Sequence, residues 1–404
     1  MLGKILNNNI INNHINMKLK YTSLLSFACA GIFFTACSSQ KNTSASNEKI
    51  PSKADVLATM QLANNYFMNK WQDPGAPTFG GGKERSSNLW TRAVYYEGLM
   101  AMYAVDPKKE YHDYAVKWGE SHKWGLRGGV ETRHADNHCA GQTYIDLYEI
   151  DGKKHPERVK DIKESIDKMM ATDKIDDWTW IDALQMAMPV YAKLGKLYND
   201  PKYYERNYEM YAYTKNKQGV NGLYNPVDKL WWRDKDFVPP YKEPNGQDCY
   251  WSRGDGWVVA ALVRTLEITP KSDPHYAEYL QDYKDMLSAL PSIQRTDGLW
   301  NVSLHDPTNF GGKELTGSAL FVYGMAYGIN NKLIDRKIYL PVMLKAWDAI
   351  VKDCVQPNGF LGWVQGTGKE PKDGQPLSVS KEPDFEDYGL GCLLLAGSEM
   401  TKLK

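Results

Sequence analysis

Asp182 is the residue of this 404-residue chain whose neighbours best suit it to chemistry. It lies between Ile181 and Leu184 in "DDWTWIDALQMAMPVYAKLG", where we expect a helix that begins near residue 176 and places Asp182 one turn in. A charged carboxylate is costly to bury unless it holds a proton or is used. Apolar surroundings and a second carboxyl raise its pKa, whereas a helix N-terminus lowers it. The pattern predicts a proton donor, with a structural role as the alternative.

The segment "RHADNHCAGQTYIDLY" supplies the second carboxyl, Asp136. His134, His138 and Cys139 lie beside it, and these residue types can bind a metal. No matching second cluster occurs elsewhere in the chain, so we predict no metal site and interpret Asp136 as an acid at the rim of a pocket. A helix-capping role for Asp136 is the structural alternative, and it is compatible with catalysis.

A third candidate segment, "YWSRGDGWVVAALVRTLE", contains an Arg-Gly-Asp tripeptide of the kind that acts as an adhesion signal. An adhesion signal needs a mobile loop tip, but here apolar residues follow at helical spacing, from Val259 to Leu266. Asp255 stands where the N-cap of that helix is expected, with a glycine on each side. The segment therefore favours the mouth of a pocket over an exposed adhesion tag.

The elements that must position these residues form a repeating pattern. Six apolar helical segments begin near residues 86, 135, 176, 253, 311 and 383, and more polar helical stretches separate them. This alternation predicts an all-α toroid of six hairpins, with an α-solenoid as the main alternative. In a closed ring all inner helices run the same way, so their N-termini meet at one end. Asp136, Asp182 and Asp255 would then share one cavity with several tryptophans.

The N-terminal sequence predicts export. Lys18 and Lys20 precede the short apolar stretch "SLLSFACAGIFF", which is typical of a signal peptide and too short to span a bilayer. Phe-Thr-Ala-Cys at its end resembles a lipobox, which predicts lipidation of Cys37; ordinary secretion with an incidental cysteine is the alternative. We therefore expect a signal segment at 1–36, a flexible tether at 37–54 and a catalytic domain at 55–404, in a lipoprotein of the periplasm or outer membrane of a Gram-negative bacterium.

Charge limits the partners. The chain has 49 basic and 49 acidic side chains, so nothing electrostatic favours nucleic acid or an anionic membrane surface. We expect contact with a membrane only through the lipid anchor. Thirteen tryptophans and 26 tyrosines offer flat faces for sugar rings, although aromatic residues also fill helical cores.

Four motifs together resemble one enzyme family. The segments "NLWTRAVYYEGL", "ADNHCAGQTYIDLY", "TWIDALQMAMP" and "WSRGDGW" are similar to the unsaturated rhamnogalacturonyl hydrolases of glycoside hydrolase family 105, which are relatives of the unsaturated glucuronyl hydrolases. The similarity covers about residues 55–400 and implies an (α/α)6 barrel. It also implies that Asp182 is the general acid/base and Asp136 a second essential aspartate.

The same resemblance implies the substrate-binding residues. Trp251, Arg253 and Trp257 match positions that line the subsite for the unsaturated sugar, with Arg253 the candidate partner of its carboxylate, and Trp90 matches an aromatic that packs on the ring. We add His134 and Asp255 to these candidates. Two departures occur: Asp255 stands where the family often has Asn, and the loop "NGLYNPVDKLWWRD" lacks a family His. Trp231, Trp232 and Arg233 are possible substitutes for that His.

The chemistry implied is hydration of the C4=C5 double bond that polysaccharide lyases leave on a terminal uronic acid, and it needs no cofactor. The expected substrate is an unsaturated uronyl oligosaccharide from pectin or another uronic-acid polysaccharide. Two alternatives remain at this point. One is a conventional glycosidase that uses Asp136 and Asp182 on saturated oligosaccharides, and the other is a non-catalytic glycan-binding lipoprotein.

Overall fold

The computed structural model describes residues 49–80, 82–382 and 387–404. The predicted signal segment 1–36 and the predicted lipidation site Cys37 lie outside these residues, as does most of the predicted tether. Nothing in the structure therefore bears on export or lipidation.

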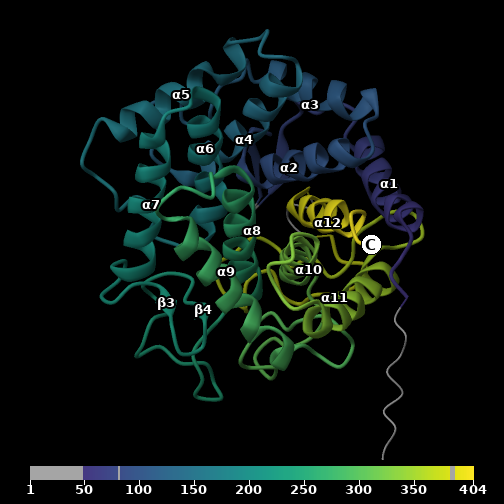
Figure 1. Ribbon diagram of the computed structural model, residues 1–404. Coiled ribbons are helices and arrows are strands. Elements are labelled where there is room, and N and C mark those ends of the chain that lie inside the picture. Colours follow the sequence, from purple (N-terminus) through teal and green to yellow (C-terminus); the bar gives the residue numbers. More distant parts are fainter. Residues whose placement is uncertain (1–48, 81, 383–386) are drawn as a thin grey trace, which may run out of the picture. The chain divides into compact units, whose positions relative to one another are not determined.

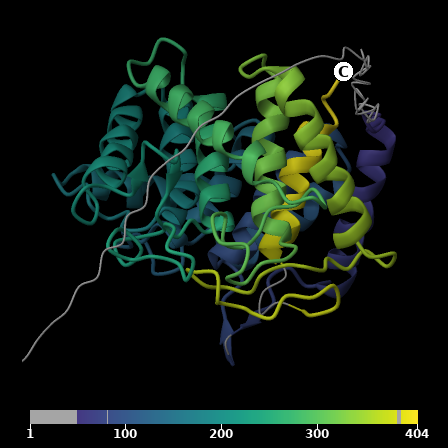
Figure 2. The ribbon, with the colours of Figure 1, turned by 90° about the horizontal axis from the view of Figure 1, so that it is seen from below.

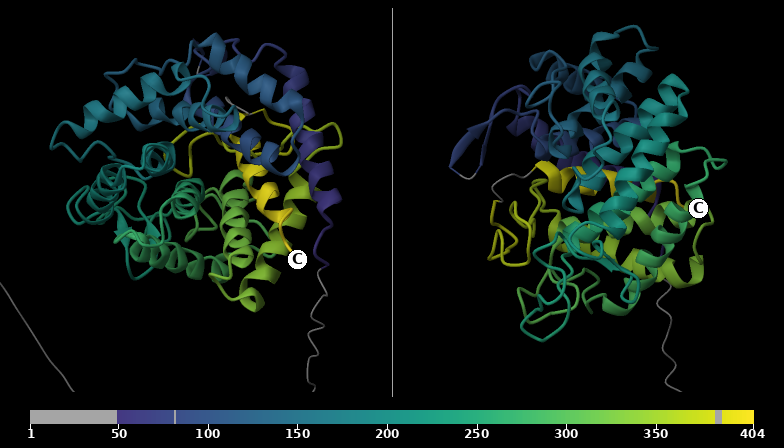
Figure 3. Two further views of the ribbon diagram at one scale, coloured as in Figure 1. Left: turned by 45° about the horizontal axis from the view of Figure 1, so that its top comes forward. Right: turned by 90° about the vertical axis from the view of Figure 1, so that its left-hand side faces the viewer.

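In the part of the chain that the structure describes, six inner helices form a closed ring, in which each packs against the next and the last packs against the first (Figure 1). They are α2 (Trp90–Val105), α4 (Ala135–Ile150), α6 (Asp182–Tyr198), α8 (Ser252–Ile268), α10 (Leu315–Asn330) and α12 (Asp387–Met400). Figure 3 shows α12 beside α1 and α2, where the ring closes. Closure excludes the open α-solenoid and confirms the predicted (α/α)6 barrel.

Among the described residues, six outer helices each lie on an inner helix. They are α1 (Lys53–Lys70), α3 (Lys109–Ser121), α5 (Glu157–Met170), α7 (Pro201–Asn216), α9 (Tyr276–Ala289) and α11 (Arg336–Ala349). Helices α1 and α12 form one hairpin-like pair, and the other outer helices pack on the inner helix that precedes them in sequence. The outer helices bury one face, whereas α10 is buried along its length except at Asn330. This difference is the one that the alternation of polar and apolar segments predicts.

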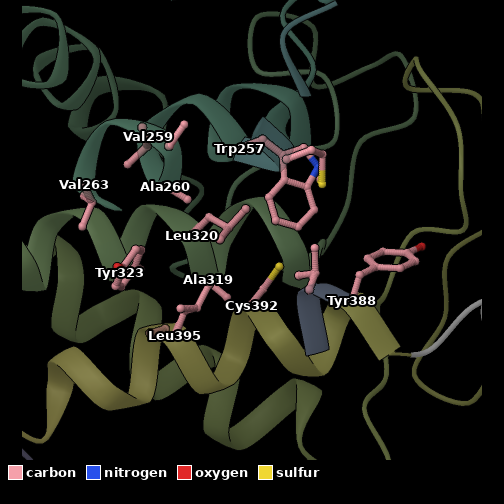
Figure 4. Close-up of a cluster of buried hydrophobic side chains, with 14 of the residues drawn as sticks. Trp257, Val259, Ala260, Val263, Ala319, Leu320, Tyr323, Tyr388, Cys392 and Leu395 are labelled. Carbon is pink, nitrogen blue, oxygen red and sulfur yellow. The ribbon is translucent and has the colours of Figure 1, made fainter. Parts of the chain in front are cut away.

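The inner helices approach one another closely. Figure 4 shows apolar side chains of α8, α10 and α12 packed together, among them Trp257, Leu320 and Cys392. A side chain at Gly317 of α10 would place its Cβ 2.7 Å from the carbonyl of Ser252, and one at Gly391 of α12 would place it 2.3 Å from the carbonyl oxygen of Val94. Glycine is therefore required at these two helix contacts.

Helix α6 begins later than predicted. It starts at Asp182 rather than near residue 176, so Asp182 is the first residue of the helix and not one turn in. The reason is a tertiary contact: the N–H of Ile181 donates to the carbonyl of Arg233 at 2.9 Å, and Trp180 and Asp234 form an isolated β-bridge. This pairing keeps the residues before Asp182 out of the helix.

Short elements complete the domain. An antiparallel hairpin joins β1 (Thr78–Gly80) to β2 (Lys83–Arg85), and a second joins β3 (Tyr224–Asn225) to β4 (Leu230–Trp231). A 3-10 helix, η1, spans Pro291–Ile293, and a π-helix, η2, spans Ile350–Cys354. In Figure 2 the β1–β2 hairpin and the yellow segment before α12 lie at the end of the barrel where α12 begins.

Two further properties concern the described part of the chain. None of its helices has both the length and the apolar character needed to cross a bilayer. Its four cysteines, Cys139, Cys249, Cys354 and Cys392, are buried free thiols.

Candidate active site

The barrel brings Asp136 and Asp182 to the same end of neighbouring helices. Asp136 is the second residue of α4 and Asp182 is the first residue of α6, and α4 packs against α6. Burial raises the pKa of Asp136 to about 7, and the charge of nearby Asp182 adds to the increase. Burial also raises the pKa of Asp182. Two coupled carboxyls of this kind release their protons in separate steps, so the pair can hold one proton near neutral pH.

The two oxygens of Asp182 have different environments. Oδ2 accepts a hydrogen bond from Nη2 of Arg233 at 3.3 Å, whereas Oδ1 is buried and has no hydrogen-bond partner among the described residues. The charges of Arg233 and Arg253 lower the pKa of Asp182, but burial outweighs them. The residue is 8% exposed. Oδ1 is therefore the position at which a transferable proton can reside.

Arg233 comes from the loop in which the sequence lacks the family His. Besides Asp182 it contacts Asp234, to which Nη1 donates at 2.6 Å. Of its two neighbours in that loop, Trp231 is fully buried and Trp232 is half-buried. Among the three suggested substitutes, Arg233 is the one for which the structure shows a hydrogen bond to Asp182.

Arg253 is held by the chain itself. Its Nη1 and Nη2 donate to the carbonyls of Gln365 and Gly366 at 2.7 and 2.8 Å, and its guanidinium lies over the rings of Trp251 and Tyr388. Arg253 and Trp251 are each 1% exposed. The indole Nε1 of Trp251 donates to Oε1 of Gln365 at 2.8 Å. These residues form a packed wall, and both terminal nitrogens of Arg253 already have partners.

Trp90 is the partly exposed aromatic of this wall. Its ring lies edge-on to Trp257, with centroids 6.4 Å apart, and is tilted against Tyr388 at 5.4 Å. Trp257 is fully buried. A sugar ring can therefore contact Trp90 directly, whereas Trp257 supports the position of Trp90.

Two histidines near Asp136 have different surroundings. His134 is exposed, packs against Trp180 with centroids 4.8 Å apart, and places Nδ1 3.8 Å from Asp136. His138 is fully buried and its Nε2 contacts the carbonyl of Thr132 and the hydroxyl of Ser165. Within the residues that the structure describes, no group of three or more His, Cys, Asp or Glu side chains is arranged to hold a metal.

Asp255 does not cap α8. Trp251 occupies the N-cap position and Asp255 lies inside the first turn, with its N–H donating to the carbonyl of Trp251 at 2.9 Å. Its Oδ1 accepts a hydrogen bond from the backbone N–H of Trp231 at 2.9 Å. Asp255 is 0% exposed, and burial raises its pKa well above the ordinary value. It joins α8 to β4 and is not accessible to a substrate at the surface.

Sequence reasoning missed three residues of this site. Gln365 accepts from Trp251 and, through its carbonyl, from Arg253; the hydroxyl of Tyr388 also donates to that carbonyl. Asp234 holds Arg233. The motif "WWRD" contained a signal for Asp234, since an Arg–Asp pair follows two tryptophans. Gln365 lies in a loop without a local pattern.

Comparisons with known proteins identify the family of this chain. Residues 59–404 match the family model described as Glycosyl Hydrolase Family 88. The chain is 32% identical over 333 residues to the "Unsaturated 3S-rhamnoglycuronyl hydrolase" of Formosa agariphila, an alignment that covers 78% of this chain and 85% of the relative.

Solved structures give the same result. A glycosyl hydrolase family 88 protein from Bacteroides vulgatus superposes with a TM-score of 0.78 at 29% identity, and the match covers 87% of this chain and 100% of that one. A possible member of family GH105 from Salmonella enterica superposes with a TM-score of 0.69 at 21% identity, covering 87% of this chain and 95% of that one. The second likeness supports the fold alone.

Proposed function

The chain belongs to glycosyl hydrolase family 88, and on that premise we propose that it removes the unsaturated uronic acid from the non-reducing end of lyase-generated oligosaccharides. The observation that carries this proposal is the pair of Asp136 and Asp182, two carboxyls with raised pKa values at one end of the barrel. A carboxyl that stays protonated near neutral pH can donate a proton to an alkene.

The reaction proceeds by hydration of the C4=C5 bond. Asp182 donates a proton to C4, and positive charge develops at C5, where the ring oxygen stabilises it. The carboxylate of Asp182 then takes a proton from water as that water adds to C5. The hemiketal collapses and releases the neighbouring sugar. Asp136 binds substrate hydroxyls and keeps the proton within the pair. General acid–base catalysis of this kind contributes roughly 10²–10⁴-fold.

The substrate we propose is an unsaturated uronide linked to rhamnose. Support comes from the name of the relative from Formosa agariphila, an "Unsaturated 3S-rhamnoglycuronyl hydrolase" that aligns with 78% of this chain. Trp90 lies at the end of the barrel that carries Asp136 and Asp182, and its ring is accessible. This ring offers a surface for the sugar.

Incubation with lyase digests tests the function. We expect the ultraviolet absorbance of the conjugated double bond to disappear from rhamnose-containing digests, with and without sulfate on the rhamnose, while saturated oligosaccharides stay intact. Cleavage of saturated oligosaccharides would instead support a conventional glycosidase. Binding without any change in the digests would support a glycan-binding protein.

We also propose that the protein is exported and acylated at Cys37, in the periplasm or outer membrane. The basic residues, short apolar stretch and Phe-Thr-Ala-Cys sequence before the tether support this. Labelling of cells with a palmitate analogue tests it. We expect label on the full-length chain in the membrane fraction, and we expect Cys37→Ser to lose both the label and the membrane association.

A further inference from the structure

Arg233 makes ionic contacts with Asp234 and Asp182, and the contact with Asp182 is the longer. Its Nη1 lies 2.6 Å from Asp234 and its Nη2 lies 3.3 Å from Asp182, while its buried Nε has no partner in the described part of the chain. The backbone of Arg233 is itself fixed, because its carbonyl accepts from the N–H of Ile181. Asp234 therefore anchors the guanidinium, and the contact with Asp182 is the one that can be exchanged.

The second arginine near Asp182 is committed elsewhere. Arg253 is buried and donates through both terminal nitrogens to backbone carbonyls, whereas Arg233 is partly exposed; the Nε of each arginine has no partner in the described part of the chain. An incoming anion can contact Arg233 without removing the hydrogen-bond donors of two carbonyls. Arg233 is thus the better placed partner for the substrate carboxylate.

Substrate chemistry brings that carboxylate next to Asp182. The carboxylate is bonded to C5, and C5 is bonded to C4, the atom that receives the proton. Any acid that protonates C4 must therefore lie within a few bond lengths of the carboxylate. An ionised Asp182 would repel it, since two like charges at such a distance disfavour each other in a partly buried site.

We propose that Arg233 exchanges Asp182 for the substrate carboxylate, and that this exchange loads the catalytic proton onto Asp182 only when substrate is bound. In the free enzyme Arg233 favours ionised Asp182, so the single proton of the pair resides on Asp136. When the uronate takes Arg233, Asp182 becomes the stronger base and Oδ1 receives the proton from Asp136 or, at alkaline pH, from solvent. The proton then passes to C4, and the water that adds to C5 returns one to Asp182. This inference rests on the proposed function.

The charges around Asp182 support the exchange. Groups from the adjoining elements that act on it or are acted on by it are Arg233, Asp234, Arg253, Asp136 and Asp255. Arg233 and Arg253 are the cations among them, and they lower the pKa of Asp182. Asp136 in turn faces His134, whose Nδ1 lies 3.8 Å away, and the charges of Arg233 and Arg127 lower its pKa. Without the Arg233 contact, the neighbouring carboxyls and burial raise the pKa of Asp182 further.

Proton uptake by the wild-type enzyme tests the exchange directly. Saturated glucuronate, which is not consumed, serves as the probe, and calorimetry in buffers of different ionisation enthalpy measures the protons taken up. Well above pH 7 we expect uptake that approaches one proton per glucuronate bound, and near pH 6 we expect much less, because the pair already holds a proton. The methyl ester of glucuronate should bind weakly and cause no uptake. Binding of glucuronate without uptake at alkaline pH would overturn the proposal.

Variants of Arg233 provide the second readout. For Arg233→Met we expect kcat/KM on the unsaturated substrate to fall by at least about tenfold, inhibition by glucuronate to weaken by a similar factor, and the free-enzyme pKa in the pH profile to rise. Arg233→Lys should restore part of each. Arg133→Met is the matched control, since Arg133 pairs with Asp177 close to α6 but does not contact Asp182. If the wild type turns over the substrate and Arg233→Met has the same KM, inhibition and pH profile as the wild type, this proposal is overturned. The proposed function stays intact in that case.

Discussion

Gln185 of α6 donates a hydrogen bond through Nε2 to Oε2 of Glu97 in α2, at 2.7 Å, in the buried interior of the barrel. The other oxygen of Glu97 accepts from the thiol of Cys139 in α4, at 3.1 Å. All three residues are at most 1% exposed. Gln185 follows Asp182 by one turn, and Cys139 follows Asp136 by one turn. Glu97 therefore joins the two helix ends that carry the paired carboxyls.

Glu97→Gln is expected to lower kcat more than it changes KM. The amide cannot accept from both donors, so the first turns of α4 and α6 lose a shared acceptor and the two carboxyls shift. Misplacement of catalytic groups by about 1 Å can cost about a hundredfold, and we expect a decrease of about ten- to a hundredfold in kcat. Steady-state kinetics on the unsaturated substrate measures it.

The pH profile separates this positioning role from a general loss of stability. If Asp136 and Asp182 move apart, the contribution of Asp182 to the raised pKa of Asp136 falls, and the corresponding limb of the profile shifts to lower pH. Glu149→Gln removes the same charge from the cavity of about 340 Å³ that Glu97 and Glu149 both line, and should leave kcat unchanged. Wild-type kcat and pH profile in folded Glu97→Gln would contradict the role.

Asp182→Asn and Asp136→Asn should have different kinetic effects. Asp182→Asn cannot donate or accept the proton, so we expect a loss of at least about a hundredfold in kcat with the fold retained by circular dichroism. Asp136→Asn keeps a polar contact to substrate hydroxyls but removes the second proton site, so both kcat and KM should change. Consumption of the unsaturated substrate by Asp182→Asn at the wild-type rate would exclude Asp182 as the acid.

Local sequence patterns predicted the parts of the site that depend on one helix. The start of α4 at Ala135, and hence the place of Asp136, follows from a polar cap before an apolar run. The start of α6 was wrong because Ile181 bonds to Arg233, more than 50 positions away in sequence, and the partners of Arg253 lie still farther along the chain. Hydrophobic periodicity contains no information on such contacts. The alternation of helices, in contrast, predicted the ring of six hairpins, although it left the open α-solenoid as an alternative that the contact between α12 and α2 excludes.

Variants of Asp255 test whether its buried hydrogen bond to β4 contributes to stability. Asp255→Asn keeps the oxygen that accepts from Trp231, so kcat should stay within about threefold of wild type. Asp255→Ala removes the acceptor and leaves a buried N–H without a partner, which should lower the free energy of unfolding by about 1–3 kcal/mol. Chemical denaturation of both variants measures the difference. Equal destabilisation by Asn and Ala would show that the hydrogen bond to β4 contributes nothing.

The raised pKa of Asp136 predicts that this residue lowers the free energy of unfolding at neutral pH. Its pKa in the folded protein, about 7, exceeds the value of about 4 for an unfolded chain, so the folded state retains a proton that the unfolded state releases. The contribution of Asp136 to the free energy of unfolding therefore falls as pH rises from about 4 to about 7 and is constant above that range. Asp136→Asn has no such proton. Relative to the wild type, the free energy of unfolding of this variant should be unchanged below about pH 4. It should be higher by at most about 4 kcal/mol above pH 7. Urea denaturation at pH 4 and pH 8 measures this, and a gain of equal size at both values would contradict the raised pKa.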